Sequence, residues 1–382
     1  MSETESNAWE NVASAKRIVL KIGSSTLTRN GELRRERFAT IARDVAAIRE
    51  TGREVVLVSS GAIAVGAARL GWDHTGRSIR QKQAAAAVGQ IGLVELYQSH
   101  FEPEGHHVGQ VLLTRAGLDD RDRFLNARRT MLELLELGVI PIVNENDTIA
   151  TEEIRFGDND NLAATIVNAV EADLLVILTD VEGLYERPPV AGEAAPPLIQ
   201  TVSEITPEIE SIAAGPGTRI GSGGMITKLE AARNAANSGA ATILCHGDLP
   251  DVLSDLMRGD RHGTLFSAGR KLKDRQHWMA FTAQVRGKIL IDEGARRALQ
   301  DRGSSLLPAG ILSVEGQFQI GDAVACVNAS GQEVARGLTS YSSGDIERLA
   351  GQPTKEIEPM LGYTHGDEII HRDDLVLIGN ED

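Results

Sequence analysis

The sequence predicts an α/β protein, with a mainly parallel sheet sandwiched by helices, followed by a small β-rich domain. The chain has 382 residues, which is more than one typical domain and suggests two. Up to about residue 250, apolar strand-like runs alternate with helix-like segments, as in parallel sheets covered on both faces. After that point the elements are short and separated by Gly-containing turns, which is typical of a small strand-rich domain.

The alternating part is expected to span residues 16–260, after a flexible polar lead at 1–15. Its helices follow an amphipathic period, and one of them should end at Gly239. In sheets of this kind, ligands bind at the carboxyl ends of the strands. Strands are predicted at residues 17–22, 54–58, 107–113, 139–143, 174–179 and 241–244, and helices at 34–50, 79–100 and 227–238.

The second part is predicted to begin with a linker at residues 261–283, because this stretch is rich in Gly, Asp and basic residues. A small domain at residues 284–365 and a tail at 366–382 should follow. Short strands are predicted in this domain at residues 288–291, 318–320, 323–327 and 333–337.

Composition narrows the class of protein. No apolar run is long enough to span a bilayer, and the N-terminus lacks a signal-peptide core. Cys245 and Cys326 lie far apart without metal-like spacing, so a reduced cytoplasm is the simplest setting. The net charge of −15 argues against nonspecific binding to nucleic acid or an anionic membrane. An anionic substrate would therefore need locally positive residues.

Two polar clusters, at residues 144–147 and 158–161, flank one short loop. The first follows the apolar run 139–143 and the second opens a helix, for which Asp158 or Asn159 is a suitable N-cap. Carboxylates and amides at the end of a buried strand suit a small polar ligand or a metal. A solvated loop with a capping residue is the alternative, but the presence of two clusters favours a binding site.

Three small-residue loops lie where the pattern predicts strand ends, at residues 21–25, 59–63 and 221–228. Backbone N–H groups in such loops can hold phosphate oxygens, and Lys21 and Lys228 would add positive charge. Each loop alone could be an ordinary tight turn, whereas three together favour a nucleotide-phosphate site. The chain has neither a Walker-type phosphate loop nor G-x-G-x-x-G after the first strand. The loops that bind the phosphates would therefore be of a different kind.

Eight motifs between Val19 and Lys228 resemble the amino acid kinase family, and most closely its members that phosphorylate L-glutamate. They read VLKIGSSTLT, VSSGAIAVG, KQAAAAVGQ, LLTRAGLDDRDRFLNAR, PIVNENDTIAT, GDNDNLAA, LTDVEGLY and GSGGMITK. The tail resembles a PUA domain, through DEGA at Asp292 to Ala295 and RGSSLLPAGI at Arg302 to Ile311. Minor departures, which bear on affinity alone, are Ile22, Ser24 and Arg155, where Leu, Thr and Lys are usual.

The resemblance implies ATP-dependent phosphorylation of the side-chain carboxylate of L-glutamate, the first step of proline biosynthesis. It implies that glutamate binds Ser60, Asp147 and Asn159, and that the nucleotide lies near Thr179 and Asp180. Mg²⁺ is expected on the ATP phosphates, with no protein ligand assigned. The ATP phosphates are placed on Lys21 and on the loop formed by Ser222, Gly223, Gly224, Met225, Ile226, Thr227 and Lys228.

The chemistry of the residues agrees with these roles. A carboxylate nucleophile is already ionised at neutral pH, so charge neutralisation by Lys21 and Lys228 matters more than a general base. Asp147 suits the α-ammonium, whereas Asn159 and Ser60 can hydrogen-bond a carboxylate without adding negative charge. Asp160 either orients Lys228 or ligates the metal, and orientation is favoured. Asp158 and Asp160 could also anchor the loop through backbone N–H groups.

Regulation and partners follow from the same resemblance. It implies feedback inhibition by L-proline, for which residues 146–157 are the candidate sensor, and a homo-oligomer, either a dimer or a tetramer. An RNA-binding protein is the competing hypothesis, because PUA-like domains occur in RNA-modifying enzymes. Residues 276–382 carry nine Lys or Arg against sixteen Asp or Glu, a balance of −7, whereas RNA-binding domains usually have a basic face.

Overall fold

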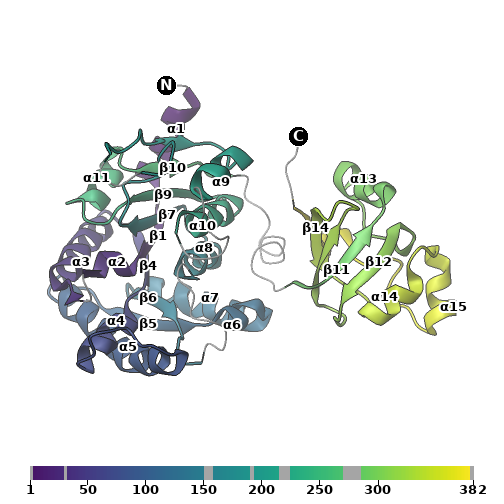
Figure 1. Ribbon diagram of the computed structural model, residues 1–382, viewed down its shortest axis with the longest axis horizontal. Coiled ribbons are helices and arrows are strands. Elements are labelled where there is room, and N and C mark those ends of the chain that lie inside the picture. The colour runs from purple at the N-terminus through teal and green to yellow at the C-terminus, as the bar shows by residue number, and fades with distance from the viewer. Residues whose placement is uncertain are drawn as a thin grey trace. The chain divides into compact units, whose positions relative to one another are not determined.

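The computed structural model describes residues 3–29, 32–149, 158–189, 193–214, 224–269 and 285–378. The chain forms two compact units, the first comprising Met1–Leu118 and Asp122–Lys271 and the second Asp119–Arg121 and Leu272–Asp382. Figure 1 draws the elements of both units. The α/β first unit and the β-rich second unit confirm the predicted fold class.

The first unit is built on an eight-stranded sheet in which every pair is parallel except β9 with β10. The central strands are nearly all Val, Ile and Leu, and β7 is buried along its whole length. Such strands must be covered on both faces. The strand order is β5 (Val108–Leu113), β6 (Ile140–Glu145), β4 (Glu54–Ser59), β1 (Arg17–Ile22), β7 (Leu174–Thr179), β9 (Ala241–His246), β10 (Thr264–Phe266), β8 (Thr201–Val202).

Helices pack on both faces of this sheet (Figure 1). One face meets α1 (Glu3–Ser14), α3 (Arg35–Glu50), α5 (Ile79–Phe101) and α11 (Val252–Arg258), whose apolar side chains join alternate strand residues in one core. The strand residues that alternate with these, among them Lys21, point to the other face of the sheet, which α8 and α10 cover. The remaining elements are α2 (Ser24–Leu27), β2 (Thr28–Arg29), β3 (Glu32–Leu33), α4 (Ala62–Arg69), α6 (Arg115–Asp119), α7 (Arg121–Glu136), α8 (Asp158–Val170), α9 (Pro207–Ala214) and α10 (Met225–Asn237).

The N-terminal residues differ from the expected flexible lead. They form helix α1, in which Trp9 and Val12 are buried in the core. The indole N–H of Trp9 donates to Thr201 Oγ1 at 3.2 Å, and the guanidinium of Arg261 lies 5.7 Å from the Trp9 ring centroid. Trp9 and Val12 are three residues apart, so they share one face of the helix, and Ala15, just beyond the end of the helix, is buried in the same core. The polar residues around them hide this signal.

The predicted linker also differs from the structure at its start. Thr264–Phe266 is fully buried as β10 of the sheet, so the first unit continues beyond residue 260. A strand of three residues in a Gly- and Asp-rich stretch is too short for a periodic signal. Residues 270–283 of that predicted linker lie outside the described part of the chain.

The second unit contains a five-stranded sheet with short helices around it. The sheet order is β12 (Ile311–Gly316), β11 (Val285–Ile291), β13 (Ala323–Val327), β14 (Glu333–Leu338), β15 (Leu375–Leu377). Its first helix, α13, is capped by the carboxylate of Asp292, which accepts from Ala295 N at 2.7 Å. The helices are α13 (Glu293–Arg302), α14 (Ser343–Leu349) and α15 (Ile357–Leu361), with 3₁₀ turns at Pro308–Gly310, Thr354–Glu356 and Arg372–Asp374.

Two expectations for this unit differ from the structure. Residues 318–320, predicted as a strand, form a loop in which Phe318 is an anchor buried in the core, and the strand is instead Ile311–Gly316. The predicted tail contributes β15 to the sheet and the fully buried Ile369 and Ile370 to the core. The alternation Phe318-Gln319-Ile320 is too short to define a strand, and the apolar residues of the tail stand singly or next to turns, so tertiary packing decided both segments.

Neither cysteine is placed for reactivity. Cys245 and Cys326 are buried in the two separate cores, and burial raises the pKa of each thiol to about 12. At neutral pH both remain protonated, so they act as small apolar residues. Across the described ranges, no helix combines the length and apolar character needed to cross a bilayer.

Candidate active site

Polar residues gather at the carboxyl ends of the central parallel strands. Lys21 is near the end of β1, Ser59 closes β4, Asn144 is near the end of β6 and Thr179 closes β7. Because neighbouring parallel strands end at the same edge of a sheet, these residues lie at one edge. All four are buried despite their polarity. Buried polar groups need partners, and α8 supplies them for Lys21 and Asn144, while Ser59 contacts Tyr97 of α5 and Thr179 contacts Asp180.

Asp160, on the first turn of α8, joins two lysines from different elements. Its Oδ1 lies 2.7 Å from Nζ of Lys21 and its Oδ2 lies 3.2 Å from Nζ of Lys228. The hydroxyl of Thr227 also donates to Oδ2, at 2.8 Å. The Asp160 side chain is fully buried, and that of Lys21 is 7% exposed. We call Lys21, Asp160 and Lys228 the charge cluster.

The charge cluster carries one net positive charge. Burial alone would raise the pKa of Asp160, but the nearby Lys21 and Lys228 hold that pKa below its usual value. Burial lowers the pKa of Lys21, against the attraction of Asp160. A buried carboxylate held ionised by two cations orients both ammonium groups and leaves their spare N–H bonds for an anion.

The glycine after Lys21 allows a close approach of two strands. Gly23 N donates to Leu178 O of β7 at 3.2 Å. A Cβ at Gly23 would lie 3.3 Å from that carbonyl oxygen and 3.6 Å from Nζ of Lys21. A side chain here would therefore press on the carbonyl oxygen of Leu178 and touch the lysine, which favours a glycine at this position.

A second, uncharged group of residues lies at the ends of β4 and β6. The side-chain N–H₂ of Asn159 donates to Oγ of Ser60 at 2.9 Å and to Oδ1 of Asn144 at 3.1 Å. The same Oδ1 of Asn144 accepts from the backbone N–H of Glu145 at 2.9 Å. We call Ser60, Asn144 and Asn159 the amide cluster. Asn159 lies within the first turn of α8 rather than capping it, so its side chain is free to reach these strands.

Two interlocked helices fix the segment that follows Ser60. Gly61, the residue before α4, has a φ of 103°, in the left-handed region that favours glycine. A Cβ at Gly66 of α4 would lie 1.7 Å from Ala85 O, and one at Gly89 of α5 would lie 1.7 Å from Ala62 O. The two backbones therefore touch, and the motifs VSSGAIAVG and KQAAAAVGQ describe this packing as well as the site.

The other residues expected to bind nucleotide or substrate are placed as follows. The hydroxyl of Thr179 donates to Asp180 Oδ1 at 3.0 Å, with Thr179 buried and Asp180 exposed. Asp147 is 8% exposed and follows β6. Ser222 and Gly223 lie outside the described residues. Gly224 precedes α10, whose first residues Met225, Ile226, Thr227 and Lys228 are half-buried.

The sequence assigned no individual role to Asn144 or Tyr97, which the structure places at the site. It placed Thr227 only at the ATP phosphates, without its contact to Asp160. Asn144 belongs to the amide cluster. Tyr97 of α5 is fully buried, and its hydroxyl lies 2.9 Å from Ser59 Oγ. Thr227 contacts Asp160. The available signal for Asn144 and Ser59 was a polar side chain at the end of an otherwise apolar buried strand, while Tyr97 within an apolar helix gave none.

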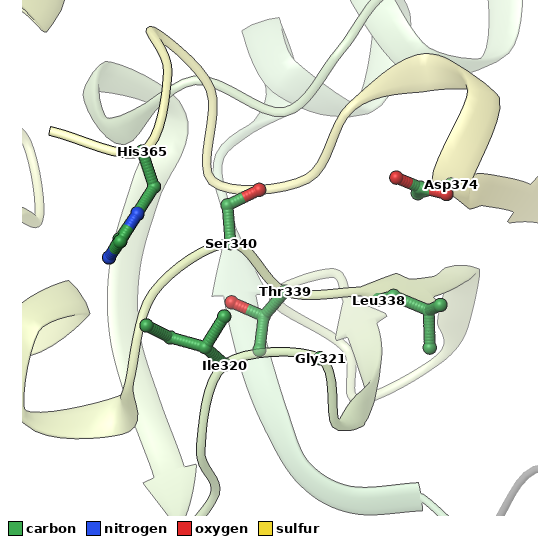
Figure 2. A pocket seen from close by; sticks show the side chains of 7 residues that line it. All are labelled: Ile320, Gly321, Leu338, Thr339, Ser340, His365 and Asp374. Atoms are coloured by element: carbon green, nitrogen blue, oxygen red, sulfur yellow. The ribbon is translucent and has the colours of Figure 1, made fainter.

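A separate hollow of about 280 Å³ lies in the second unit. Figure 2 shows His365 and Ile320 at one end and Leu338 and Asp374 at the other. No Lys or Arg is among the described residues that line it, so it offers no fixed cationic group to an anion. The lining residues are Ile320, Gly321, Leu338, Thr339, Ser340, His365 and Asp374.

Comparison with known proteins agrees with this arrangement. Residues 16–246 match the model of the amino acid kinase family, and residues 287–361 match the PUA domain. The chain is 51% identical to the glutamate 5-kinase of Methylobacillus flagellatus, over 95% of this chain and 98% of that protein. It is 49% identical to the one of Paraburkholderia phymatum and 50% identical to the one of Geobacter sulfurreducens, in each case over 96% of this chain and 99% of the relative. The chain is therefore a kinase of the amino acid kinase family, in the glutamate 5-kinase group that carries a C-terminal PUA domain.

Proposed function

We propose that this protein phosphorylates the side-chain carboxylate of L-glutamate with ATP, giving L-glutamate 5-phosphate and ADP. The observation that carries the proposal is the buried carboxylate of Asp160, held by Lys21 and Lys228 beside the uncharged Ser60 and Asn159. The relatives named glutamate 5-kinase, which match nearly the whole chain, support the same reaction.

The charge cluster suits this chemistry. A glutamate side chain has a pKa of about 4.3, so it is ionised at neutral pH and needs no general base. Its oxygen would attack the γ-phosphorus in line as the bond to the β,γ-bridging oxygen breaks and ADP leaves with the electron pair. The main obstacle is repulsion between two anions. One net positive charge on Lys21, Asp160 and Lys228 offsets that repulsion, and a lost contact of this kind typically costs about 10²–10³ in rate.

The nucleotide would lie across the ends of β1 and β7 and the start of α10. Lys21 and the segment from Ser222 to Lys228 would hold the phosphates, with the partial positive charge of the α10 N-terminus adding to them. Thr179 and Asp180 would lie near the nucleotide. Asp160 would orient the two lysines rather than bind a metal, because both of its oxygens are already committed to ammonium groups.

Mg²⁺ would be carried by the ATP phosphates. No group of three or more His, Cys, Asp or Glu side chains suited to a metal ion occurs within the described ranges. Mg²⁺ usually needs only one or two protein carboxylates when phosphates and waters fill its other positions. When bound, it would neutralise charge on the phosphate oxygens.

L-Glutamate would bind at the amide cluster and Asp147. Asp147, buried after β6, would attract the α-ammonium. Ser60 and Asn159 would bind polar groups of the substrate without adding negative charge. Uncharged partners matter here because both carboxylates of the substrate are anionic, and a further buried anion beside them would repel both.

We infer the pathway and the regulation from the resemblance to the amino acid kinase family. The product would feed proline biosynthesis in the cytoplasm, and L-proline would inhibit its own first step at a site that overlaps the glutamate site. The protein would act as a dimer or tetramer. The candidate sensor spans residues 146–157, of which 150–157 lie outside the described part of the chain. Unchanged inhibition by L-proline after substitution of Glu153 and Ile154 would argue against that sensor.

The reaction is tested by measuring ADP release with L-glutamate, L-aspartate and N-acetyl-L-glutamate, in the presence of ATP and Mg²⁺. Hydroxylamine traps the acyl phosphate as a hydroxamate. We expect hydroxamate with L-glutamate and little with the other two. Strong signal with aspartate or acetylglutamate and none with glutamate would assign the protein to a different amino acid kinase.

A further inference from the structure

We propose that Asn144 is a positioning residue that fixes the side-chain amide of Asn159, so that the oxygen rather than the nitrogen of Asn159 binds the substrate. Asn159 would then accept from the α-ammonium of L-glutamate, and Ser60 would donate to a carboxylate. This inference rests on the proposed function and deepens it. It also reverses the expectation from the sequence, in which Asn159 donates to the substrate carboxylate.

The orientation of Asn144 is settled by the main chain. Its Oδ1 lies 2.9 Å from the backbone nitrogen of Glu145, a group that can only donate. The atom of Asn144 at this position must therefore be the oxygen. Asn144 is 3% exposed and belongs to strand β6, so the sheet holds this oxygen in place.

The orientation of Asn159 follows from that of Asn144. The atom of Asn159 that lies 3.1 Å from Asn144 Oδ1 must be the nitrogen, since two amide oxygens would repel. The same nitrogen lies 2.9 Å from Ser60 Oγ and 3.4 Å from the carbonyl oxygen of Ser59. Its two N–H bonds are thus committed to protein acceptors.

The oxygen of Asn159 remains to be satisfied. It is buried, and none of the described residues donates a hydrogen bond to it. A buried acceptor without a donor is costly, so such atoms are uncommon in folded proteins. At neutral pH the α-ammonium is the donor that L-glutamate offers, whereas its carboxylates can only accept. Asn159 and Asp147 would together form the ammonium site.

Ser60 takes the complementary role. Its Oγ accepts from Asn159, which leaves the hydroxyl proton free to donate elsewhere. A donor next to the start of α4 suits a carboxylate, since the N–H groups at a helix N-terminus point toward anions. The amide cluster would thus distinguish the ammonium from the carboxylate of an amino acid, because Asn159 accepts a hydrogen bond and Ser60 donates one.

The test is equilibrium binding by calorimetry of three ligands: L-glutamate, 4-aminobutyrate and glutarate. 4-Aminobutyrate lacks the α-carboxylate, and glutarate lacks the ammonium. Asn144→Leu removes the acceptor that orients Asn159. We expect this variant to bind L-glutamate and 4-aminobutyrate about 10-fold more weakly, as for the loss of a hydrogen bond to a charged group, and to bind glutarate unchanged.

Two matched variants separate positioning from general damage. Asn144→Asp keeps an acceptor for both Glu145 and Asn159 but adds a buried negative charge, so we expect it to weaken glutarate more than 4-aminobutyrate, which carries the ammonium. Gln90→Leu removes a neighbouring buried hydrogen bond, from Gln90 Nε2 to Glu145 O at 3.2 Å, and should not change the ranking of the ligands. Each variant is compared by circular dichroism with the unsubstituted protein.

Two results would overturn the inference. Equal weakening of all three ligands by Asn144→Leu would show a merely structural role. Selective weakening of glutarate by Asn144→Leu would show that the nitrogen of Asn159 binds a carboxylate. Failure of the unsubstituted protein to bind L-glutamate is a different result, because it would contradict the proposed function itself.

Discussion

Two polar clusters lie at the same edge of the sheet, but they solve the problem of burial differently. The charge cluster keeps Asp160 fully buried by pairing it with Lys21 at 2.7 Å and Lys228 at 3.2 Å. The amide cluster contains no formal charge and uses the hydrogen bonds of Asn159 to Ser60 and Asn144. Asn159 and Asp160 are consecutive residues of α8, so one helical turn supplies both clusters.

The difference matches what each cluster would have to bind. Burying full charges is expensive unless they are paired, so a net positive charge is retained where it meets a strongly anionic group such as a phosphate. Neutral dipoles cost less to bury and can tell a donor from an acceptor on the ligand. We therefore expect the charge cluster to act mainly on the rate of phosphoryl transfer, and the amide cluster mainly on the affinity for the amino acid.

The largest expected effect is on the rate, from Lys21→Met. Methionine has similar length but no charge, so the developing charge at the phosphate loses a partner. We expect kcat to fall by about 10²–10³, with the Kd for L-glutamate changing only a few-fold. ADP release gives kcat and calorimetry gives Kd. The exposed Lys16, substituted in the same way, is the control, and a loss confined to glutamate affinity would contradict the division between the clusters.

Asp160→Asn should cause the largest loss of stability. It leaves Lys21 buried without its carboxylate, and breaking a buried ion pair on one side costs about 3–5 kcal/mol. Urea unfolding at neutral pH measures the change in the free energy of unfolding. Ser60→Ala is the comparison within the amide cluster, and it should cost less, since it removes a neutral hydroxyl and leaves no buried charge without a partner.

The effect of Asp160 on stability should depend on pH. Its pKa in the folded protein lies below the ordinary value of 3.8, because Lys21 and Lys228 outweigh the effect of burial. A carboxylate with a lowered folded pKa stabilises the protein fully above its unfolded pKa, and this stabilisation is lost as the pH falls through the folded pKa. The difference between the protein and Asp160→Asn should therefore shrink below about pH 3.8. A constant difference down to that range would contradict an ionised Asp160.

Gly89→Ala should damage the amide cluster from a distance. The added methyl group would meet the backbone oxygen of Ala62, so α4 must move, and only Gly61 separates α4 from Ser60. We expect a loss of about 1–3 kcal/mol in the free energy of unfolding. The affinity for L-glutamate should fall more than the affinity for ATP. Gly344→Ala in α14 is the matched control, because no heavy atom lies within 4 Å of its added Cβ. Equal losses for both ligands would show a general effect on folding.

The sequence predicted the larger features of the fold because they depend on periodic burial. Strands such as Leu174–Thr179 are apolar on both faces, which only a covered parallel sheet allows. It failed for Trp9 and for β10, where a few buried residues in a polar or Gly-rich context have no repeating pattern. It named Lys21, Asp160 and Lys228, since charged residues next to glycine loops are visible in a sequence. The direction of the Asn159 amide was not predictable, because it depends on the backbone N–H of Glu145 through Asn144.

The smallest expected effect comes from Tyr97→Phe, which tests how firmly the end of β4 is held beneath the amide cluster. The substitution removes the contact of 2.9 Å between the phenol oxygen and Ser59 Oγ inside the core. Ser59 Oγ keeps a second hydrogen bond, to the carbonyl oxygen of Ser60 at 3.0 Å, so its burial remains satisfied. We therefore expect a loss of only about 0.5–1.5 kcal/mol in the free energy of unfolding, with kcat unchanged. A fall in kcat comparable with that of Lys21→Met would show that the two clusters are coupled through β4, and that the division between rate and affinity is wrong.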